Sequence, residues 1–346
     1  MRILFIGGTG IISTACTQLA LQRGFDLTLF NRAQRERTPS AAGAKQIAAD
    51  LNDTAAAQAA LAGQRWDVVV DFIAFSPAQV RQRIELFRGR VGQYIFISSA
   101  SAYQKPVTQY LLTESTPLAN PYWAYSRDKI ACEELLLQAL RDEQFPATIV
   151  RPSFTYGETA IPLALNSGSM PYTVVDRMRR GAPVIVPGDG TSLWQLTHNS
   201  DFAKGLIGLL GHQSATGHAF HITSDEVLDW NQIYRAVADA ASVAQPDLVH
   251  IASDFIAACV PAETGGLHGD KSNSVVIDNT KIKRFVPEFV ATTRFRDGVK
   301  RSIAWFDADA SRRKIDREVN RRHDMMVAAY RRGLQAAVAE FAATPH

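Results

Sequence analysis

A glycine-rich turn follows the first apolar run of this chain, and no other feature constrains its fold as strongly. The run Arg2–Ile6 has the length of a buried strand and Ile12–Arg23 has helical spacing, so Gly7-Gly8-Thr9-Gly10 joins a strand to a helix. Glycines in such a turn let the backbone approach a pyrophosphate, and the helix amino terminus offers unpaired N–H groups. The small Ser13 stands where such turns usually carry a third glycine. The motif predicts a dinucleotide site formed by Gly7, Thr9, Gly10, Ile11 and Ile12.

Short apolar runs then alternate with helical patterns through the first half of the chain. This alternation is typical of an α/β protein with a doubly wound parallel sheet, the Rossmann fold. The further strands expected are Leu27–Phe30, Gln46–Ala49, Trp66–Phe72, Gln93–Ile97 and Ala147–Val150, and Tyr125–Leu140 is expected to form a long helix.

The regular alternation weakens after Gly157. We therefore expect residues 1–157 to form the dinucleotide-binding domain and residues 158–346 to form mainly a smaller substrate-binding lobe with C-terminal helices. The helical pattern over residues 197–210 is expected to return to the first domain. Glu263–Ser274 is rich in glycine and polar residues, which predicts a mobile loop.

Composition limits the classes of function. The chain has 346 residues, a net charge of +3 and three cysteines that are far apart in sequence. Neither a disulfide framework nor a metal cluster is indicated, and a reducing cytoplasm is the expected location. No apolar run approaches the roughly 20 residues of a membrane span, and we expect no signal peptide. The small positive charge does not call for a polyanionic partner.

Residues that follow the predicted strands indicate which dinucleotide binds. An acidic residue after the second strand would bind the adenosine ribose and repel a 2′-phosphate. Asn31 is neutral there and Arg32 is cationic, which favours NADP over NAD, although NAD stays possible. The other cofactor contacts expected at strand ends are Asp50 and Leu51 near the adenine, and Phe72, Ile73 and Ala74 beneath the cofactor.

Tyr125 and Lys129 lie four residues apart at the start of a predicted helix and so face the same way. Tyrosine ordinarily ionises near pH ~10, and a nearby ammonium stabilises the phenolate. Such a pair also occurs by chance on helix surfaces. Upstream, however, the strand ending at Ile97 runs into a series of hydroxyl residues, Ser98-Ser99-Ala100-Ser101. A serine at the carboxyl end of a parallel strand can bind an oxygen beside the tyrosine.

These motifs occur in the order found in a known group of enzymes. Together with Arg151-Pro152-Ser153 and Pro187-Gly188-Asp189-Gly190, the chain resembles the extended short-chain dehydrogenase/reductase superfamily, in its NAD-dependent epimerase/dehydratase group. The resemblance covers roughly residues 1–306. It implies that Ser99, Tyr125 and Lys129 are catalytic, that Lys129 also binds the ribose, and that Pro152 and Ser153 lie beside the nicotinamide. It also implies a homodimer formed through the helix carrying Tyr125 and a neighbouring helix over residues 77–88.

Two departures from the group narrow the reaction. Dehydratases of the group usually follow the catalytic hydroxyl with an Asp–Glu pair, whereas Ala100-Ser101 follows Ser99 here. Nucleotide-sugar enzymes tend to carry an arginine after the Gly-Asp-Gly motif, and Trp194 occupies about that place. An indole cannot neutralise a diphosphate but can stack on a sugar ring, unless it simply packs in the core. We expect Ser101, Tyr172 and Trp194 to contact the substrate.

The expected function is hydride transfer at a carbinol or carbonyl carbon of a sugar-like or other small polar substrate. One alternative is a (nucleotide-)sugar epimerase, which shows no net redox change. A second is RNA binding without catalysis, because the chain also resembles the chloroplast stem-loop-binding proteins. The arginines after residue 310 are interleaved with acidic residues at helical spacing, which is typical of a solvated face or a helix–helix contact, although an RNA-binding edge stays possible.

Overall fold

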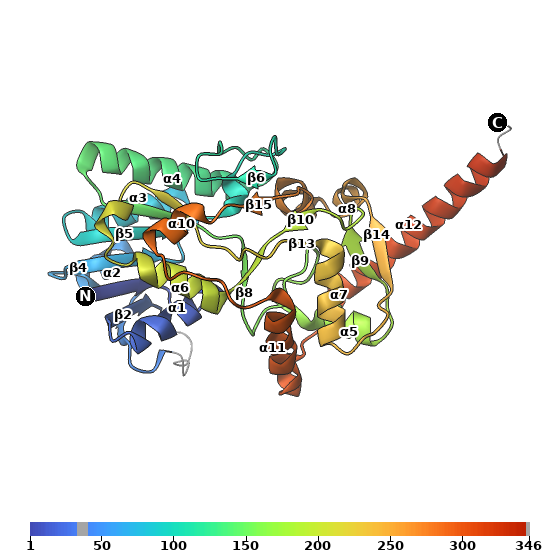
Figure 1. Ribbon diagram of the computed structural model, residues 1–346, viewed down its shortest axis with the longest axis horizontal. Helices are drawn as coiled ribbons and strands as arrows, with labels where there is room; N and C mark the ends of the chain where they lie inside the picture. Colours follow the sequence, from blue (N-terminus) through green and yellow to red (C-terminus); the bar gives the residue numbers. More distant parts are fainter. Residues whose placement is uncertain (33–40, 344–346) are drawn as a thin grey trace. The chain divides into compact units, whose positions relative to one another are not determined.

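The computed structural model describes residues 1–32 and 41–343 (Figure 1). The chain divides into two compact units, and each unit is made of three separate segments. The first unit comprises Met1–Gly157, Gln195–Val227 and Val275–Thr293. The second comprises Glu158–Trp194, Leu228–Ser274 and Arg294–His346.

The first unit is built on a seven-stranded parallel sheet, counted over the described residues. Its strand order is β12-β7-β5-β4-β1-β2-β3, and every neighbouring pair is parallel. This is the doubly wound arrangement, and the predicted α/β Rossmann fold is confirmed. The strands are β1 (Arg2–Ile6), β2 (Asp26–Asn31), β3 (Lys45–Ala48), β4 (Trp66–Asp71), β5 (Val91–Ile97), β7 (Ala147–Arg151) and β12 (Ala219–His221).

Helices cover both faces of this sheet, because successive side chains of a strand point to opposite faces. On one face, Ile3 and Phe5 of β1 belong to the core cluster that includes α1 (Ile11–Gln22) and α6 (Asn199–Leu209). On the other face, Leu4 and Ile6 belong to the cluster that includes α2 (Thr54–Ala60), α3 (Pro77–Phe87) and α4 (Ala124–Glu143). Figure 1 shows α1 and α6 on the side of the sheet opposite α3 and α4.

Shorter elements complete the first unit. Two strand pairs, β8 with β11 and β6 with β15, lie outside the main sheet. Their bounds, with those of the remaining helices, are η2 (Ala100–Ala102), β6 (Leu111–Leu112), β8 (Phe154–Tyr156), β11 (Leu196–His198), η3 (Gln213–Ala215), β15 (Val276–Ile277) and α10 (Thr280–Phe285).

The second unit is mainly helical, with two small strand pairs, β9 with β14 and β10 with β13. The prediction that Glu263–Ser274 forms a mobile loop is wrong, because helical turns occupy most of this segment and Leu267 is fully buried in it. The elements are α5 (Tyr172–Arg179), β9 (Val184–Pro187), β10 (Leu193–Trp194), β13 (Leu228–Asp229), α7 (Trp230–Ala240), β14 (Leu248–Ile251), α8 (Ser253–Cys259), η4 (Pro261–Glu263), α9 (Thr264–Gly266), η5 (Leu267–Lys271), α11 (Phe295–Asp307), η6 (Ala310–Arg312) and α12 (Arg317–Ala343).

Across the described parts of both units, no helix combines the length and apolar character that crossing a membrane requires.

Candidate active site

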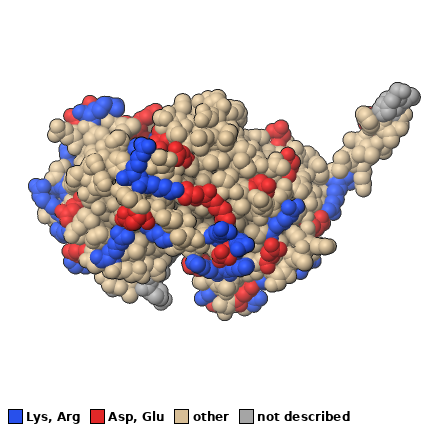
Figure 2. Space-filling model, viewed as in Figure 1, with Lys and Arg blue, Asp and Glu red and all other residues tan. Residues whose placement is uncertain are grey.

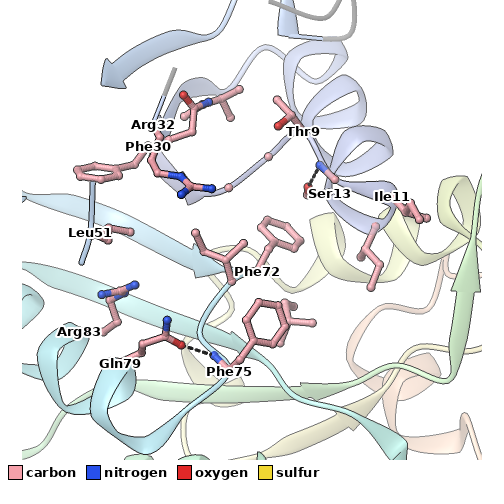
Figure 3. A pocket seen from close by; sticks show the side chains of 18 of the residues that line it. Thr9, Ile11, Ser13, Phe30, Arg32, Leu51, Phe72, Phe75, Gln79 and Arg83 are labelled. Carbon is pink, nitrogen blue, oxygen red and sulfur yellow. Dashed lines mark hydrogen bonds between the residues drawn. The ribbon is translucent and has the colours of Figure 1, made fainter. Parts of the chain in front are cut away.

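A cavity of about 840 Å³ lies within the first unit, at the carboxyl ends of the parallel strands (Figure 3). Ligands of open α/β sheets bind at this edge. Ser99, Tyr125 and Lys129, which come from three different parts of the chain, all line this one cavity. So do most of the predicted cofactor residues: Gly7, Thr9, Gly10, Ile11, Ile12, Asn31, Arg32, Asp50, Leu51, Phe72, Ile73, Pro152 and Ser153.

The glycine turn leaves room that any larger residue would fill. Gly7 and Gly8 both have φ near +102°, which side chains other than glycine rarely adopt. A Cβ on Gly8 would lie 2.7 Å from Cδ2 of Leu29. Ser13, which replaces the usual third glycine, accepts a hydrogen bond from the Gly10 amide at 2.9 Å and so ties the turn to α1. The turn can therefore hold a pyrophosphate against the amino terminus of α1.

The wall after β2 carries the residues that would meet the adenosine ribose. The Asn31 side-chain oxygen accepts a hydrogen bond from Gln46 Nε2 at 2.8 Å. Arg32 is exposed and lines the cavity beside it. Figure 3 places Arg32 on the same wall as Phe30. This wall thus offers a guanidinium and an amide where an NAD-specific site would offer a carboxylate.

Lys129 is buried, and its ammonium is held by backbone carbonyls. Nζ donates to the carbonyl oxygens of Ala74, in the segment that follows β4, and of Ile97, at the end of β5, both at 2.8 Å. Burial lowers the pKa of Lys129 to about 8, opposed by the nearby acidic groups. An ammonium has three protons, so one remains for a ribose hydroxyl or for Tyr125, whose ring centroid is 5.8 Å away. Ala74 was predicted to contact the cofactor; it is fully buried and outside the cavity lining, and it acts here through its carbonyl.

Ser99 belongs to a group of hydroxyls. Its Oγ lies 2.9 Å from Ser101 Oγ and accepts a hydrogen bond from the Ser101 amide at 3.2 Å. Ser101 in turn accepts a hydrogen bond from Ser126 Oγ of α4 at 2.8 Å. Ser101 was predicted to contact substrate, but it is 4% exposed and its hydroxyl binds protein groups. The Ser101 hydroxyl therefore holds Ser99 in position by hydrogen bonding and does not line the cavity.

A buried ion pair that the sequence analysis missed joins three elements of the site. The Glu133 carboxylate, on α4 one turn after Lys129, accepts hydrogen bonds from Arg151 Nη2 at 2.5 Å and from Ser98 Oγ at 2.5 Å. Burial opposes the charge of Arg151, but its bonds to Glu133 outweigh that effect and raise the pKa of the guanidinium. Ser98 precedes Ser99 and Arg151 precedes Pro152, so Glu133 fixes both segments against the helix that carries Tyr125.

A second buried acid, Asp71, fixes the segment that follows β4. The sequence did not predict its partners. The Asp71 carboxylate accepts bonds from the amides of Ile73 and Ala74, both at 2.9 Å. It also accepts bonds from Arg83 Nε at 3.1 Å and from Tyr94 Oη at 2.9 Å. The segment that supplies a carbonyl to Lys129 is thereby fixed. The position of Asp71 at a strand end was the available signal, but nothing local in the sequence indicates Arg83.

Two predicted substrate residues lie in the second unit and pack against protein. Tyr172 is 5% exposed, packs on Phe306 with ring centroids 5.7 Å apart, and accepts a hydrogen bond from Arg179 at 2.6 Å. Trp194 is 4% exposed and stacks on Trp230 with centroids 6.0 Å apart. The contacts of both side chains are those of core residues, so the structure offers no free aromatic face at either position.

The fold and the glycine turn are those of the Rossmann-type dinucleotide-binding class. A family model, that of the NAD dependent epimerase/dehydratase family, matches residues 3–223, and the chain belongs to this family.

Known relatives of this chain differ in what their names describe. The chloroplast stem-loop binding protein of 41 kDa b from Arabidopsis thaliana is 24% identical over 261 residues, which cover 72% of this chain and 65% of that protein. The 2′-dehydrokanamycin reductase of Streptomyces kanamyceticus is 25% identical over 245 residues, which cover 69% of this chain and 66% of the reductase. The chain thus spans just under two thirds of the length of either relative.

Solved structures share the fold. The UDP-glucuronic acid 4-epimerase of Bacillus cereus, in complex with UDP-glucuronic acid and NAD, is similar to this chain with a TM-score of 0.70 at 17% identity. The match covers 89% of this chain and 99% of the epimerase. The likeness at this level of identity is one of fold.

Proposed function

We propose that this chain is an NADP-dependent oxidoreductase that transfers a hydride at a carbinol or carbonyl carbon of a sugar-like or other small polar substrate. The observation that carries the proposal is that Ser99, Tyr125 and Lys129 line the same cavity as the glycine turn. The nicotinamide, when bound, supplies or accepts the hydride. Tyr125 gives or takes the proton of the substrate oxygen, and Ser99 orients that oxygen. Lys129 stabilises the phenolate through its charge and holds the ribose with its remaining proton.

Net reduction or oxidation is favoured over epimerisation by two observations. One relative of this chain is named 2′-dehydrokanamycin reductase. In addition, the place where nucleotide-sugar enzymes tend to carry an arginine holds Trp194, which is buried and stacked on protein. A panel of keto-sugars and sugar alcohols, assayed with NADPH and NADP⁺, tests the proposal through the ultraviolet absorbance of the reduced nicotinamide. Isomerised product without an absorbance change would instead establish the epimerase.

Cofactor preference gives a sharper test. Replacing Arg32 with glutamate is expected to weaken NADPH binding by roughly 10- to 150-fold, because charge-assisted hydrogen bonds to the 2′-phosphate are lost and repulsion is added. NADH has no phosphate there, and its affinity should change little. Titration calorimetry with both cofactors measures the ratio. Arg81→Glu on the exposed surface of α3, which changes the net charge equally, is the control. Equal effects of Arg32→Glu on the two cofactors would contradict the NADP assignment.

RNA binding is the second candidate, because one relative is named as a stem-loop binding protein. Lysine and arginine side chains are interspersed with acidic ones over the face shown in Figure 2, rather than gathered in one basic stripe. Several late arginines are paired, as in Arg321–Glu318 at 2.8 Å and Arg331–Asp247 at 3.1 Å. Salt-dependent binding of a stem-loop RNA at low micromolar concentration or tighter would favour this candidate.

Assembly as a homodimer is also proposed, from the family resemblance. The helices expected to form the interface, α3 and α4, pack beside each other in the first unit (Figure 1). Gel filtration at micromolar concentration tests this, and elution as a monomer would contradict it.

A further inference from the structure

The hydroxyls of Ser126, Ser101 and Ser99 form a series of hydrogen bonds. The number of protons that each hydroxyl can donate determines which one is the donor in each bond. Each serine hydroxyl has one proton to donate and two lone pairs to accept. Ser126 Oγ donates to Ser101 Oγ at 2.8 Å, which uses the single proton of Ser126. Ser101 keeps its own proton, and Ser99 Oγ at 2.9 Å is the acceptor that remains for it among the described residues.

Ser99 Oγ consequently accepts as many hydrogen bonds as a hydroxyl oxygen can. Its Oγ receives the Ser101 hydroxyl at 2.9 Å and the Ser101 amide at 3.2 Å. With both lone pairs occupied, Ser99 can bind a substrate only by donating its proton. A donor is what a carbonyl oxygen needs, and it is needed more strongly as that oxygen gains negative charge during hydride addition.

The surrounding contacts hold this chain of hydroxyls in place. Ser126 is fully buried and Ser101 is 4% exposed, so water does not compete for their protons. Asn120 Nδ2 donates to the Ser101 carbonyl at 2.8 Å, and Asn120 Oδ1 accepts bonds from the amides of Tyr122 and Trp123, both at 3.2 Å. Asn120 thereby ties the turn carrying Ser101 to the start of the helix carrying Ser126.

We propose that Ser126 and Ser101 are positioning residues that fix Ser99 as a hydrogen-bond donor toward the substrate oxygen. The inference rests on the proposed hydride-transfer function and deepens it. It places a hydrogen-bond acceptor of the substrate, a carbonyl or developing alkoxide oxygen, beside Ser99, and it excludes a substrate group that can only donate. Neither serine touches substrate, and both act through Ser99.

A double-mutant cycle tests the chain of hydroxyls. Ser101→Ala and Ser126→Ala are each expected to lower kcat by about 2- to 10-fold, the range for one net hydrogen bond, while the dissociation constant of NADPH stays unchanged. Because Ser126 acts only through Ser101, adding Ser126→Ala to Ser101→Ala should cause no further loss. Ser126→Thr keeps a hydroxyl and should restore most of kcat.

A matched control separates this role from a merely structural one. Thr148, a fully buried residue outside the cavity lining, donates to the Ala215 carbonyl at 3.1 Å. Thr148→Val should lower the melting temperature at least as much as Ser126→Ala does, with kcat unchanged. The inference would be overturned if the kcat losses of Ser101→Ala and Ser126→Ala multiplied in the double variant, or if Ser126→Ala kept wild-type kcat. Either result would leave the proposed function standing. Full turnover in Tyr125→Phe would overturn both.

Discussion

Replacing Tyr125 with phenylalanine is expected to lower kcat for hydride transfer by about 10²- to 10⁴-fold, the usual contribution of a positioned proton donor. The loss should fall on kcat, because the ring is kept and the cavity wall proposed to bind the dinucleotide is unchanged. The neighbouring ammonium of Lys129 is buried and held by the carbonyls of Ala74 and Ile97, so it cannot move to replace the missing hydroxyl. Steady-state kinetics with the best keto-substrate measure the loss.

The control for Tyr125→Phe removes a phenolic hydroxyl elsewhere. Tyr110 is 61% exposed and outside the cavity lining, and Tyr110→Phe should leave both kcat and KM at wild-type values. Calorimetric titration with NADPH should give wild-type affinity for both variants. If Tyr125→Phe keeps full turnover, proton transfer does not pass through this residue and the proposed mechanism fails.

Replacing Glu133 with glutamine is expected to reduce the free energy of unfolding by about 3–5 kcal/mol. The change removes the charge that faces Arg151 and leaves a buried guanidinium without compensation. Both partners are almost inaccessible, with side-chain exposures of 5% for Arg151 and 1% for Glu133. Urea denaturation followed by circular dichroism measures the difference.

The helix that carries Glu133 also supplies the control. Glu143, at the end of α4, pairs with Arg88 at 2.6 Å, but the side chains are 39% and 56% exposed. Water solvates that pair, so Glu143→Gln should cost less than about 1 kcal/mol. A similar small cost for Glu133→Gln would show that the buried pair is not what fixes Ser98 and Arg151 against α4.

The parts of the site that sequence predicts well are those with local signatures. The glycine turn, Asn31-Arg32 after β2 and the Tyr125–Lys129 pair each depend on a few adjacent residues and on the rule that ligands bind at the carboxyl ends of parallel strands. Once the order of strands is known, these segments must meet at one edge. This is why they line a single cavity in the structure.

The parts that sequence does not predict depend on contacts between distant segments. Glu133 and Ser98 are 35 residues apart, and neither has a neighbour that indicates the other. Ser101 was predicted from its position after Ser99, yet whether it faces substrate or Ser126 depends on how η2 packs on α4. Trp194 has the size and chemistry of a sugar-stacking residue, but its place against Trp230 is settled only by the packing of the second unit.

The order in which the chain visits the two units has a consequence for biosynthesis. The sheet ends with β12, which pairs with β7, but residues 158–194 of the second unit lie between these two strands in sequence. The nascent chain must therefore emerge from the ribosome as far as His221 before β12 can join the sheet. By then residues 158–194 have already emerged, while the later segments of the second unit have not yet been synthesised. Parallel pairing across long separations is slow and leaves apolar edges open for longer. The nascent chain should accordingly be most vulnerable to aggregation, and most in need of chaperones, between the synthesis of β7 and that of β12.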